Sequence, residues 1–289
     1  MKNIKGLNAI VTGGSRGLGP IIAEALAKEG VNLVLAARSK EELTIVAKDL
    51  SVHGTRTVAV PVDITDADSL KKLVEQAHRE LGSIEILINN AGIEWVCSYI
   101  KLSLEYIRRI IDTNLRGPLL LTRLLLPHML ERGKGHVVTM SSLGGQKGSP
   151  YSATYAATKA GLIEWTSGLR EELRGTGVSA SVVCPGFVSE KGMFAVYNKR
   201  APAMTGETTP DKVAKAVIHA IREDKQEIIV NPGPVLIMKL CEAIHPAIMT
   251  TILRLSGVYE FYRKQAAENE AAENEASEGE LDSGLRIRD

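Results

Sequence analysis

The sequence contains few aromatic residues and few cysteines, and it has almost no net charge. Phe, Trp and Tyr together make up 4% of the 289 residues, and the formal net charge is +1. A charge so evenly balanced gives the chain no general attraction to nucleic acid. The hydrophobic fraction of 44% and the charged fraction of 24% exclude a wholly disordered, collagen-like or disulfide-stapled protein. The length suffices for one large α/β domain with a sizeable core.

The three cysteines and six histidines show no metal-binding spacing. Cys97, Cys184 and Cys241 lie far apart, with no CxxC pair, and the histidines form no HxxxH or HExxH pattern. The cysteines are therefore interpreted as reduced, small core residues, and no metal site is expected. Residues 1–5 run directly into a strand-like segment, so neither a signal peptide nor an N-terminal anchor is expected, and the cytoplasm is the default location.

Seven short apolar runs alternate with segments of helical periodicity. The runs cover residues 8–12, 31–37, 57–62, 84–88, 135–140, 178–183 and 227–230. The helical segments include 20–29, 41–51, 69–80, 104–132 (with a bend near Gly117-Pro118) and 155–174. Nearly continuous hydrophobicity is typical of parallel strands buried on both faces. The rhythm predicts an α/β protein with a single doubly wound Rossmann fold over residues 1–231, in which helices flank a seven-stranded parallel sheet.

Two insertions and a tail interrupt this rhythm. Residues 185–210 form a long, turn-rich segment typical of a lid or binding element. Residues 232–264 are apolar but interrupted by charges, which fits a helical substrate lid, an oligomer contact or an amphipathic piece on a membrane surface. Residues 265–289 carry eight acidic residues against two arginines, a net charge of −6. This composition predicts a poorly ordered tail, although Ala and Glu would also allow its first half to continue a helix.

A glycine-rich loop joins the first expected strand to the first expected helix. Its pattern is Gly-x-x-x-Gly-x-Gly over residues 13–19. Glycines let the backbone approach a diphosphate, and the start of the next helix points N–H groups and positive dipole at it. The position favours a dinucleotide site, while a tight packing turn is the simpler alternative.

The end of the second strand distinguishes between dinucleotides. An NAD site would place an acidic residue there to bind the ribose 2′-hydroxyl. This chain has Arg38 instead, with no acid until Glu41, and Arg16 lies in the glycine loop. An arginine can clamp a 2′-phosphate with its planar set of donors. The pattern favours NADP(H), unless Arg38 is only a solvated residue after a strand.

A tyrosine and a lysine four residues apart share one helix face. No other tyrosine in the chain has the spacing of Tyr155 and Lys159. A nearby ammonium is expected to lower the tyrosine pKa from its usual value of about 10, towards useful acid/base strength. Ser142 follows the fifth strand, where its hydroxyl could bind a carbonyl oxygen beside Tyr155. The alternative is a helix-surface pair with no role.

Taken together, these motifs resemble those of the short-chain dehydrogenase/reductase family over about residues 5–232. The similarity rests on Thr12-Gly13-x-x-x-Gly17-x-Gly19, Asp63, Asn89-Asn90-Ala91-Gly92, Asn114, Ser142, Tyr155-x-x-x-Lys159 and Pro185-Gly186. The resemblance implies that Tyr155 exchanges a proton with the substrate oxygen while hydride moves between nicotinamide C4 and the carbonyl carbon. Lys159 would lower the Tyr155 pKa and hold the nicotinamide ribose, Ser142 would polarise the carbonyl, and Asn114 would anchor a proton-relaying water.

The expected cofactor contacts follow from the same resemblance and from the two arginines. They are Gly13, Ser15, Arg16, Gly17, Leu18, Gly19, Arg38, Asp63, Asn90, Ala91, Gly92, Tyr155, Lys159, Pro185, Gly186 and Val188. The chain departs from the family where Glu190 replaces an expected threonine, so either Ser189 substitutes for it or that contact is lost. The resemblance also implies a homodimer or homotetramer assembled through the helices at 104–132 and 155–174.

The expected function is NADPH-dependent reduction of a ketone or aldehyde to an alcohol, reversibly, on a hydrophobic or lipid-like substrate. Candidate pocket residues are Trp95, Ser142, Met193, Phe194 and Tyr197, although the apolar ones could simply pack. A 3-oxoacyl thioester reductase is the alternative within the class. A catalytically silent NADP-binding sensor or scaffold is the alternative from another class.

Overall fold

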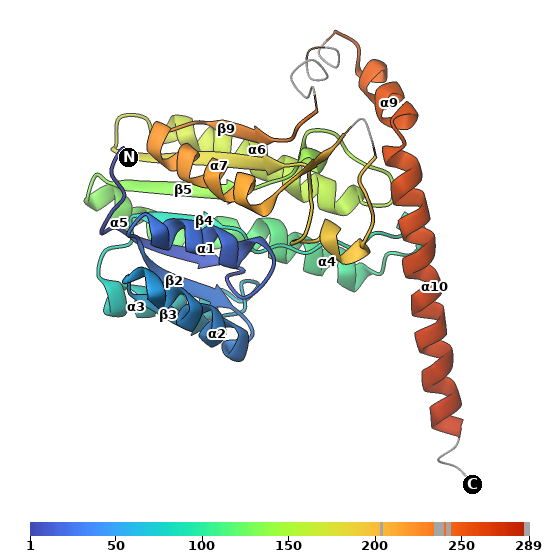
Figure 1. The fold of residues 1–289 in the computed structure, drawn as a ribbon, viewed down its shortest axis with the longest axis horizontal. Coiled ribbons are helices and arrows are strands. Elements are labelled where there is room, and N and C mark those ends of the chain that lie inside the picture. The colour runs from blue at the N-terminus through green and yellow to red at the C-terminus, as the bar shows by residue number, and fades with distance from the viewer. Residues whose placement is uncertain (203–204, 234–239, 241–243, 286–289) are drawn as a thin grey trace.

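The structure is a computed structural model, which describes residues 1–285 apart from 203–204, 234–239 and 241–243. Its central feature is one seven-stranded sheet in which every neighbouring pair is parallel, in the order β3-β2-β1-β4-β5-β6-β9 (Figure 1). The strands are β1 (Asn8–Thr12), β2 (Asn32–Ala37), β3 (Thr57–Pro61), β4 (Ile86–Asn89), β5 (Gly135–Met140), β6 (Val178–Pro185) and β9 (Glu227–Val230). The predicted doubly wound fold is confirmed, with each apolar run forming a strand.

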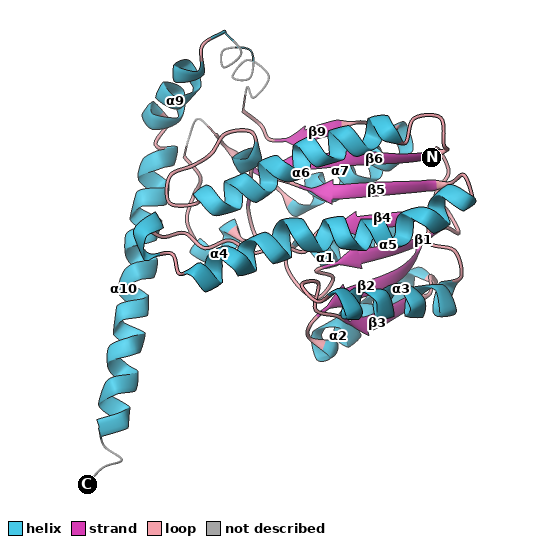
Figure 2. Ribbon diagram, turned by 180° about the vertical axis from the view of Figure 1, so that it is seen from behind, coloured by secondary structure: helices cyan, strands magenta, loops and turns pink. Residues whose placement is uncertain are grey.

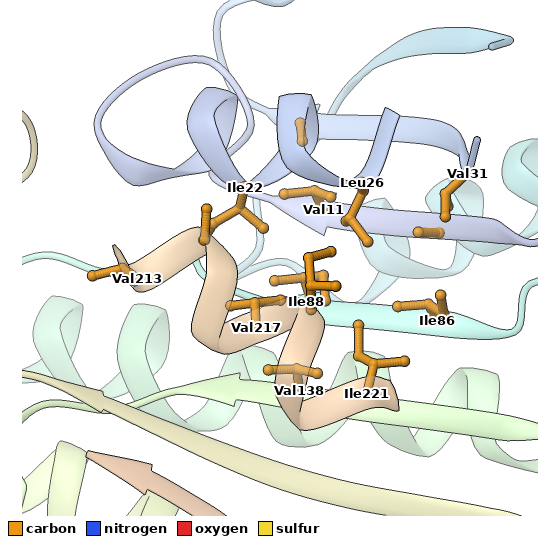
Figure 3. Close-up of a cluster of buried hydrophobic side chains, with 14 of the residues drawn as sticks. Val11, Ile22, Leu26, Val31, Ile86, Ile88, Val138, Val213, Val217 and Ile221 are labelled. Carbon is orange, nitrogen blue, oxygen red and sulfur yellow. The ribbon is translucent and has the colours of Figure 1, made fainter. Parts of the chain in front are cut away.

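Helices cover both faces of this sheet. On one face lie α1 (Leu18–Lys28), α2 (Lys40–Leu50) and α7 (Pro210–Glu223), and on the other α3 (Ala67–Leu81), α5 (Gly117–Glu131) and α6 (Ala153–Glu172). Figure 3 shows side chains of α1 and α7 packed against the central strands. Those labelled there are Val11, Ile22, Leu26, Val31, Ile86, Ile88, Val138, Val213, Val217 and Ile221. All five residues of β1 are buried, as expected for a strand covered on both faces.

The predicted bend in the long helix is a change of helix type. α4 (Leu104–Ile111) passes into a π-helical segment, Asp112–Arg116, before α5 begins at Gly117. A Cβ on Gly117 would lie 2.7 Å from the backbone oxygen of Ile64, so the helix approaches the segment after β3 closely at this point. Short π-helical segments interrupt α-helices mostly at functional sites.

The turn-rich insertion after β6 has structure of its own. Phe187–Val188 (β7) and Glu207–Thr208 (β8) form a small parallel pair, and a 3₁₀ turn covers Phe194–Tyr197. These short segments give parts of the insertion a defined structure after β6. That is the position expected of a binding element.

The C-terminal part consists of α9 (Pro246–Leu255) and a long helix α10 (Val258–Leu285). Figures 1 and 2 both show α10 crossing the edge of the domain where the parallel strands end and continuing beyond it. Where composition favoured a poorly ordered tail, the structure continues the helix to Leu285, as the strong helix propensities of Ala and Glu allow. None of the helices in the described part of the chain is long and apolar enough to cross a membrane.

Candidate active site

The predicted site residues gather where the parallel strands end. The loop after β1 holds the glycines, the loop after β4 holds Asn90, and the segments after β5 and β6 hold Ser142 and Gly186. In open parallel α/β sheets, ligands bind in the crevice at this edge. One cavity there is lined by Asn90, Ser142, Tyr155, Lys159 and Gly186 together.

Tyr155 and Ser142 face the same small space in this cavity. Ser142 begins a 3₁₀ turn after β5, and its hydroxyl accepts a hydrogen bond from the Gly144 N–H at 3.1 Å. A Cβ placed on Gly144 would lie 3.5 Å from the Ser142 Oγ and 3.6 Å from the Tyr155 Cε1. The serine hydroxyl and the phenol ring therefore lie close together in the cavity wall, both next to Gly144.

Lys159 lies one helical turn after Tyr155 and is almost completely buried. Its ammonium donates a hydrogen bond to the Met140 carbonyl at 2.8 Å and lies 5.6 Å from the centre of the Tyr155 ring. Burial lowers the Lys159 pKa to about 8, because the charged form loses its hydration. The lysine therefore still carries its charge at neutral pH and begins to lose it just above.

The pKa of Tyr155 departs from the sequence expectation. Burial raises it, and the Glu94 carboxyl raises it further, while the side chain of Ser142 opposes the shift. The expectation of a net lowered Tyr155 pKa is wrong for the structure described here, because the net shift is upward. The physical reason is that removing a phenolate from water outweighs the attraction of an ammonium whose own charge is disfavoured by burial.

Asn114 joins the π-helical segment to the loop after β4. Its amide accepts a hydrogen bond from the Ile93 N–H and donates one to the Ile93 carbonyl, both at 2.8 Å, and contacts Thr158 on α6 at 3.3 Å. A Cβ on Gly92 would lie 3.4 Å from the Asn114 Oδ1 and 3.5 Å from the Lys159 Nζ. Asn114 and Lys159 thus flank Gly92, which places them beside one another behind Tyr155.

Apolar and aromatic side chains make most of the remaining cavity wall. Met193, Phe194 and Tyr197 line it, as the sequence indicated. Trp95 does not line it and instead stacks on Tyr106 of α4, with ring centres 4.7 Å apart, so the expectation for Trp95 is corrected. The ring of Tyr106 stacks on the indole of Trp95, and the sequence alone does not show that these two residues are in contact.

The C-terminal helices supply cavity residues that the sequence reasoning did not single out. These are Met249 and Leu253 on α9, and Val258, Phe261 and Tyr262 on α10. Phe261 lies 5.7 Å from the ring centres of both Phe187 and Phe194, closing an aromatic cluster across the insertion after β6. The described part of residues 232–264 therefore contributes to the cavity wall.

Polar contacts fix α10 over the site. Its Asn269 amide donates to the Val96 carbonyl at 2.8 Å, and Glu270 accepts from the Ser98 N–H at 2.7 Å and pairs with Lys101 at 2.7 Å. On the other side, Lys199 pairs with Glu268 at 2.5 Å and contacts Gln265 at 3.0 Å. The helix therefore connects the loop after β4 with the insertion after β6.

The glycine loop has the geometry that a diphosphate requires. Gly13 and Gly17 both have φ of 66°, which only glycine adopts without strain. α1 begins directly after Gly17, and no side chain caps its first N–H groups. Uncapped N–H groups and the positive end of a helix form an anion site.

Asn90 holds this loop in place. Its side-chain amide donates to the Thr12 carbonyl at 2.9 Å, and its backbone N–H donates to the Thr12 hydroxyl at 3.0 Å. The neighbouring Asn89 contacts Thr122 at 3.0 Å. Asn90 therefore links the ends of β1 and β4, and Asn89 links the end of β4 to α5, structural roles in line with strand-end capping.

Comparison with known proteins agrees with this geometry. The family described as short chain dehydrogenase matches residues 7–201. The chain belongs to that family. Among curated relatives, it is 43% identical over 271 residues to the ketoacyl reductase HetN of Nostoc sp. strain PCC 7120, covering 92% of this chain and 94% of HetN. It is 35% identical over 228 residues to an uncharacterized oxidoreductase of Staphylococcus aureus strain USA300, covering 78% of this chain and 96% of that protein.

Solved short-chain dehydrogenases share the fold. A metagenomic short-chain oxidoreductase in complex with NADP matches with a TM-score of 0.68 and 29% identity, covering 79% of this chain and 97% of that one. The alcohol dehydrogenase of the archaeon Thermococcus sibiricus, complexed with 5-hydroxy-NADP, matches with a TM-score of 0.70 and 26% identity, covering 78% and 96%. This chain is thus an oxidoreductase of the family.

The residues expected to contact a 2′-phosphate are available for it. Arg16 and Arg38 are exposed, and neither makes a hydrogen bond or ion pair through its side chain with another described residue. Asp63, expected at the adenine, accepts hydrogen bonds from the Thr65 N–H at 2.9 Å and the Thr65 hydroxyl at 2.8 Å. The Thr65 N–H, and then Arg38 from a greater distance, hold the pKa of Asp63 below its usual value. The donor set fits a dinucleotide with a phosphorylated ribose.

The segment after Pro185-Gly186, where the sequence departs from the family pattern, lies in the small β7–β8 pair. The Ser189 hydroxyl donates to the Thr208 carbonyl at 3.2 Å, within the β7–β8 pair. Glu190, where a threonine is expected, is exposed and has a φ of 64°. Ser189 therefore already has a partner, and the cofactor contact of the missing threonine has no evident replacement here.

A single methyl group in the glycine loop is expected to remove cofactor binding. A Cβ on Gly19 would lie 2.0 Å from the Gly13 carbonyl oxygen, so Gly19→Ala must displace the loop. We expect NADPH affinity to fall at least tenfold, since backbone approach to the diphosphate is lost. The matched control is Gly168→Ala, another helical glycine, whose Cβ would meet nothing within 4 Å. Titration of NADPH fluorescence measures both, and equal affinities would contradict the assigned role of the loop.

Proposed function

We propose that this protein reduces the carbonyl group of an apolar ketone or aldehyde to an alcohol, reversibly, with NADPH. The observation that carries the proposal is that Ser142 and Tyr155 lie close together in the wall of an otherwise largely apolar cavity. A carbonyl oxygen there would receive hydrogen bonds from both hydroxyls, while apolar side chains would enclose the rest of the substrate.

Ser142, Tyr155 and Lys159 each have a separate part in the proposed reaction. NADPH, when bound, supplies the hydride that reaches the carbonyl carbon. Ser142 donates a hydrogen bond to the carbonyl oxygen and so favours the negative charge that develops on it. Tyr155, whose raised pKa keeps it protonated at neutral pH, gives its proton to that oxygen. The Lys159 ammonium then stabilises the tyrosinate, and its low pKa lets it pass a proton onward.

Proton return to Tyr155 would pass through the groups behind it. Lys159 and Asn114 flank Gly92, and the Asn114 side chain is occupied by Ile93 and Thr158. A water held at the backbone of the π-helical segment would therefore be the link between Lys159 and solvent. The same path run in reverse would serve alcohol oxidation.

A 3-oxoacyl substrate is the second candidate. It is favoured by similarity to the ketoacyl reductase HetN, whose match covers 92% of this chain and so includes most of the residues after 231. Those residues hold Phe261 and Tyr262, which line the cavity. A relative that shares the extension is more informative about the substrate than relatives that share only the sheet and its helices.

The preference for NADPH is tested by reversing one charge. Arg38→Asp should weaken NADPH binding at least tenfold while leaving NADH binding unchanged or tighter, because an acid repels a 2′-phosphate and accepts hydrogen bonds from a 2′-hydroxyl. Arg132→Asp makes the same charge change on an exposed arginine after α5, and should leave both affinities unchanged. Equal affinity of the unmodified protein for both cofactors would end the argument for NADPH.

The reaction itself is tested by following NADPH absorbance with a panel of apolar ketones and aldehydes. We expect consumption that depends on the carbonyl compound and gives the corresponding alcohol. NADPH binding without turnover of any carbonyl compound would instead favour a silent sensor or scaffold.

Homo-oligomer formation through α4, α5 and α6 forms part of the proposal. Ile100 and Leu104, beside and on α4, are 92% and 85% exposed, and Ile111 at the end of α4 is 40% exposed. Exposed apolar groups of this kind on one helix are typical of association surfaces. Light scattering of the purified protein should give the mass of a dimer or tetramer, and a monomer at micromolar concentration would contradict it.

A further inference from the structure

One carboxyl group in the cavity has no part in the chemistry described above. Glu94 follows the Asn-Asn-Ala-Gly segment after β4 and is the only acidic residue among the described residues that line the cavity. It shares this wall with Tyr155, and its charge would raise the pKa values of Tyr155, Tyr197 and Tyr262. Burying a carboxyl group among phenols and apolar side chains costs free energy unless the group is hydrogen-bonded.

The position of Glu94 is fixed on both sides. Its Oε1 accepts a hydrogen bond from the hydroxyl of Ser152 at 2.5 Å, and Ser152 is buried just before α6. The preceding residue, Ile93, is held through both backbone groups by Asn114. The carboxyl is therefore attached to the same two elements that carry the catalytic residues, so its direction relative to them is set by the fold.

The second oxygen of this carboxyl makes no hydrogen bond with the part of the chain that the structure describes. Ser152 is the only described residue with which the Glu94 side chain makes a hydrogen bond, and no described cation lies within ion-pair distance. Burial raises the Glu94 pKa, while the hydrogen bond from Ser152 and the more distant Lys159 oppose the shift. A carboxyl without a paired cation in an apolar cavity favours its neutral form, which has an O–H to donate.

We propose that the Glu94 carboxyl donates a hydrogen bond to a second carbonyl oxygen of the substrate, while the reacting carbonyl lies at Ser142 and Tyr155. The substrate class this fits is an apolar chain bearing two carbonyl groups, such as a 3-oxo ester or thioester. The inference rests on the proposed reduction and deepens it, since it names what distinguishes the substrate from a simple ketone. A substrate without the second oxygen leaves the buried acid unpaired, which is how polar pockets reject such analogues.

A cationic substrate is the competing occupant. An amine would require Glu94 to be ionised, and the positive charge of the amine would be repelled by the ammonium of Lys159, which lines the same cavity. A carbonyl oxygen needs only a neutral donor, and it fits the apolar remainder of the wall. The two occupants make opposite predictions for replacement of the acid by its neutral amide.

The test compares two substrates of matched length. Ethyl 3-oxooctanoate and undecan-6-one both have eleven chain atoms and a ketone at the same position, but only the first has the ester carbonyl. We expect the unmodified protein to prefer the ester in kcat/KM by about tenfold or more, the effect of one satisfied hydrogen bond to a buried group. Glu94→Leu should abolish the preference, because kcat/KM falls for the ester and rises for the ketone, which no longer leaves a buried acid unpaired.

Glu94→Gln is the matched control, because its amide can accept from Ser152 and still donate to the substrate. We expect Glu94→Gln to keep the ester preference. If the ionised carboxylate were required instead, Glu94→Gln would lose the preference as completely as Glu94→Leu. Melting temperature and NADPH affinity report whether each variant is folded, and the variants separate the effect of Glu94 from the greater intrinsic reactivity of a 3-oxo ester towards hydride. No ester preference, or an equal loss for both substrates in Glu94→Leu, overturns the role of Glu94. No turnover of either ketone overturns the proposed reduction as well.

Discussion

Tyr155→Phe is expected to reduce turnover by about 10²- to 10⁴-fold, the contribution typical of a positioned general acid. The substitution removes only the hydroxyl and keeps the ring, which is buried beside Ser142 and Gly144. The fold and the glycine loop do not depend on that hydroxyl, so NADPH affinity should stay within about threefold, less than the loss of one hydrogen bond. Stopped-flow measurement of NADPH oxidation, together with an NADPH titration, separates the two effects.

Tyr99→Phe provides the control for this prediction. Tyr99 is 66% exposed in a 3₁₀ turn after β4 and does not line the cavity, so loss of its hydroxyl should leave turnover unchanged. Turnover of Tyr155→Phe at the rate of the unmodified protein would remove Tyr155 from the mechanism. Loss of NADPH binding in that variant would instead assign Tyr155 to the cofactor site alone.

Ending the chain after Gly257 is expected to lower kcat/KM for an apolar ketone by about 100-fold or more. This truncation removes α10, and with it Val258, Phe261 and Tyr262 from the cavity wall. Burial of an aromatic or large aliphatic side chain against a partner contributes roughly 1.5–3 kcal/mol, so loss of two such contacts to a substrate readily exceeds a hundredfold. NADPH affinity should change little, because the glycine loop lies at the end of β1 and makes no hydrogen bond or ion pair with the described residues of α10.

Ending the chain after Glu273 is the matched truncation. It keeps Asn269 and Glu270, which bind the loop after β4, and removes only the acidic end of α10. Its kinetics should equal those of the full chain. Phe261→Ala tests the same wall without shortening the chain and should also raise KM for apolar ketones. Unchanged kinetics in both Phe261→Ala and the truncation after Gly257 would contradict the role of α10 as part of the substrate site.

The sheet could be predicted from sequence because its information is local. Each strand is a short run of buried apolar residues, as in Asn8–Thr12, and the runs alternate with helical periodicity. The pair Tyr155 and Lys159 could be found for the same reason, since four residues on a helix define one face. The resemblance to a family then assigned roles to residues that spacing alone leaves ambiguous, such as Asn114.

The composition of the cavity wall and the Tyr155 pKa could not be predicted, because they depend on contacts between segments that are distant in sequence. Tyr262 reaches the cavity because α10 packs across the ends of the strands, and no local pattern around residue 262 encodes that position. Trp95 packs on Tyr106 and does not line the cavity. Nothing in the sequence indicates whether the Trp95 side chain turns towards the cavity or towards α4. The sign of the Tyr155 pKa shift likewise required the burial of the phenol to be known, because burial and a nearby ammonium act in opposite directions.

A crystal structure of the protein with bound NADPH tests the central claim most directly. The account predicts that the nicotinamide ring lies beside Ser142 and Tyr155, with the Tyr155 hydroxyl within hydrogen-bond reach of a carbonyl oxygen placed against nicotinamide C4. A ring bound elsewhere, or a phenol turned away from it, would contradict the account.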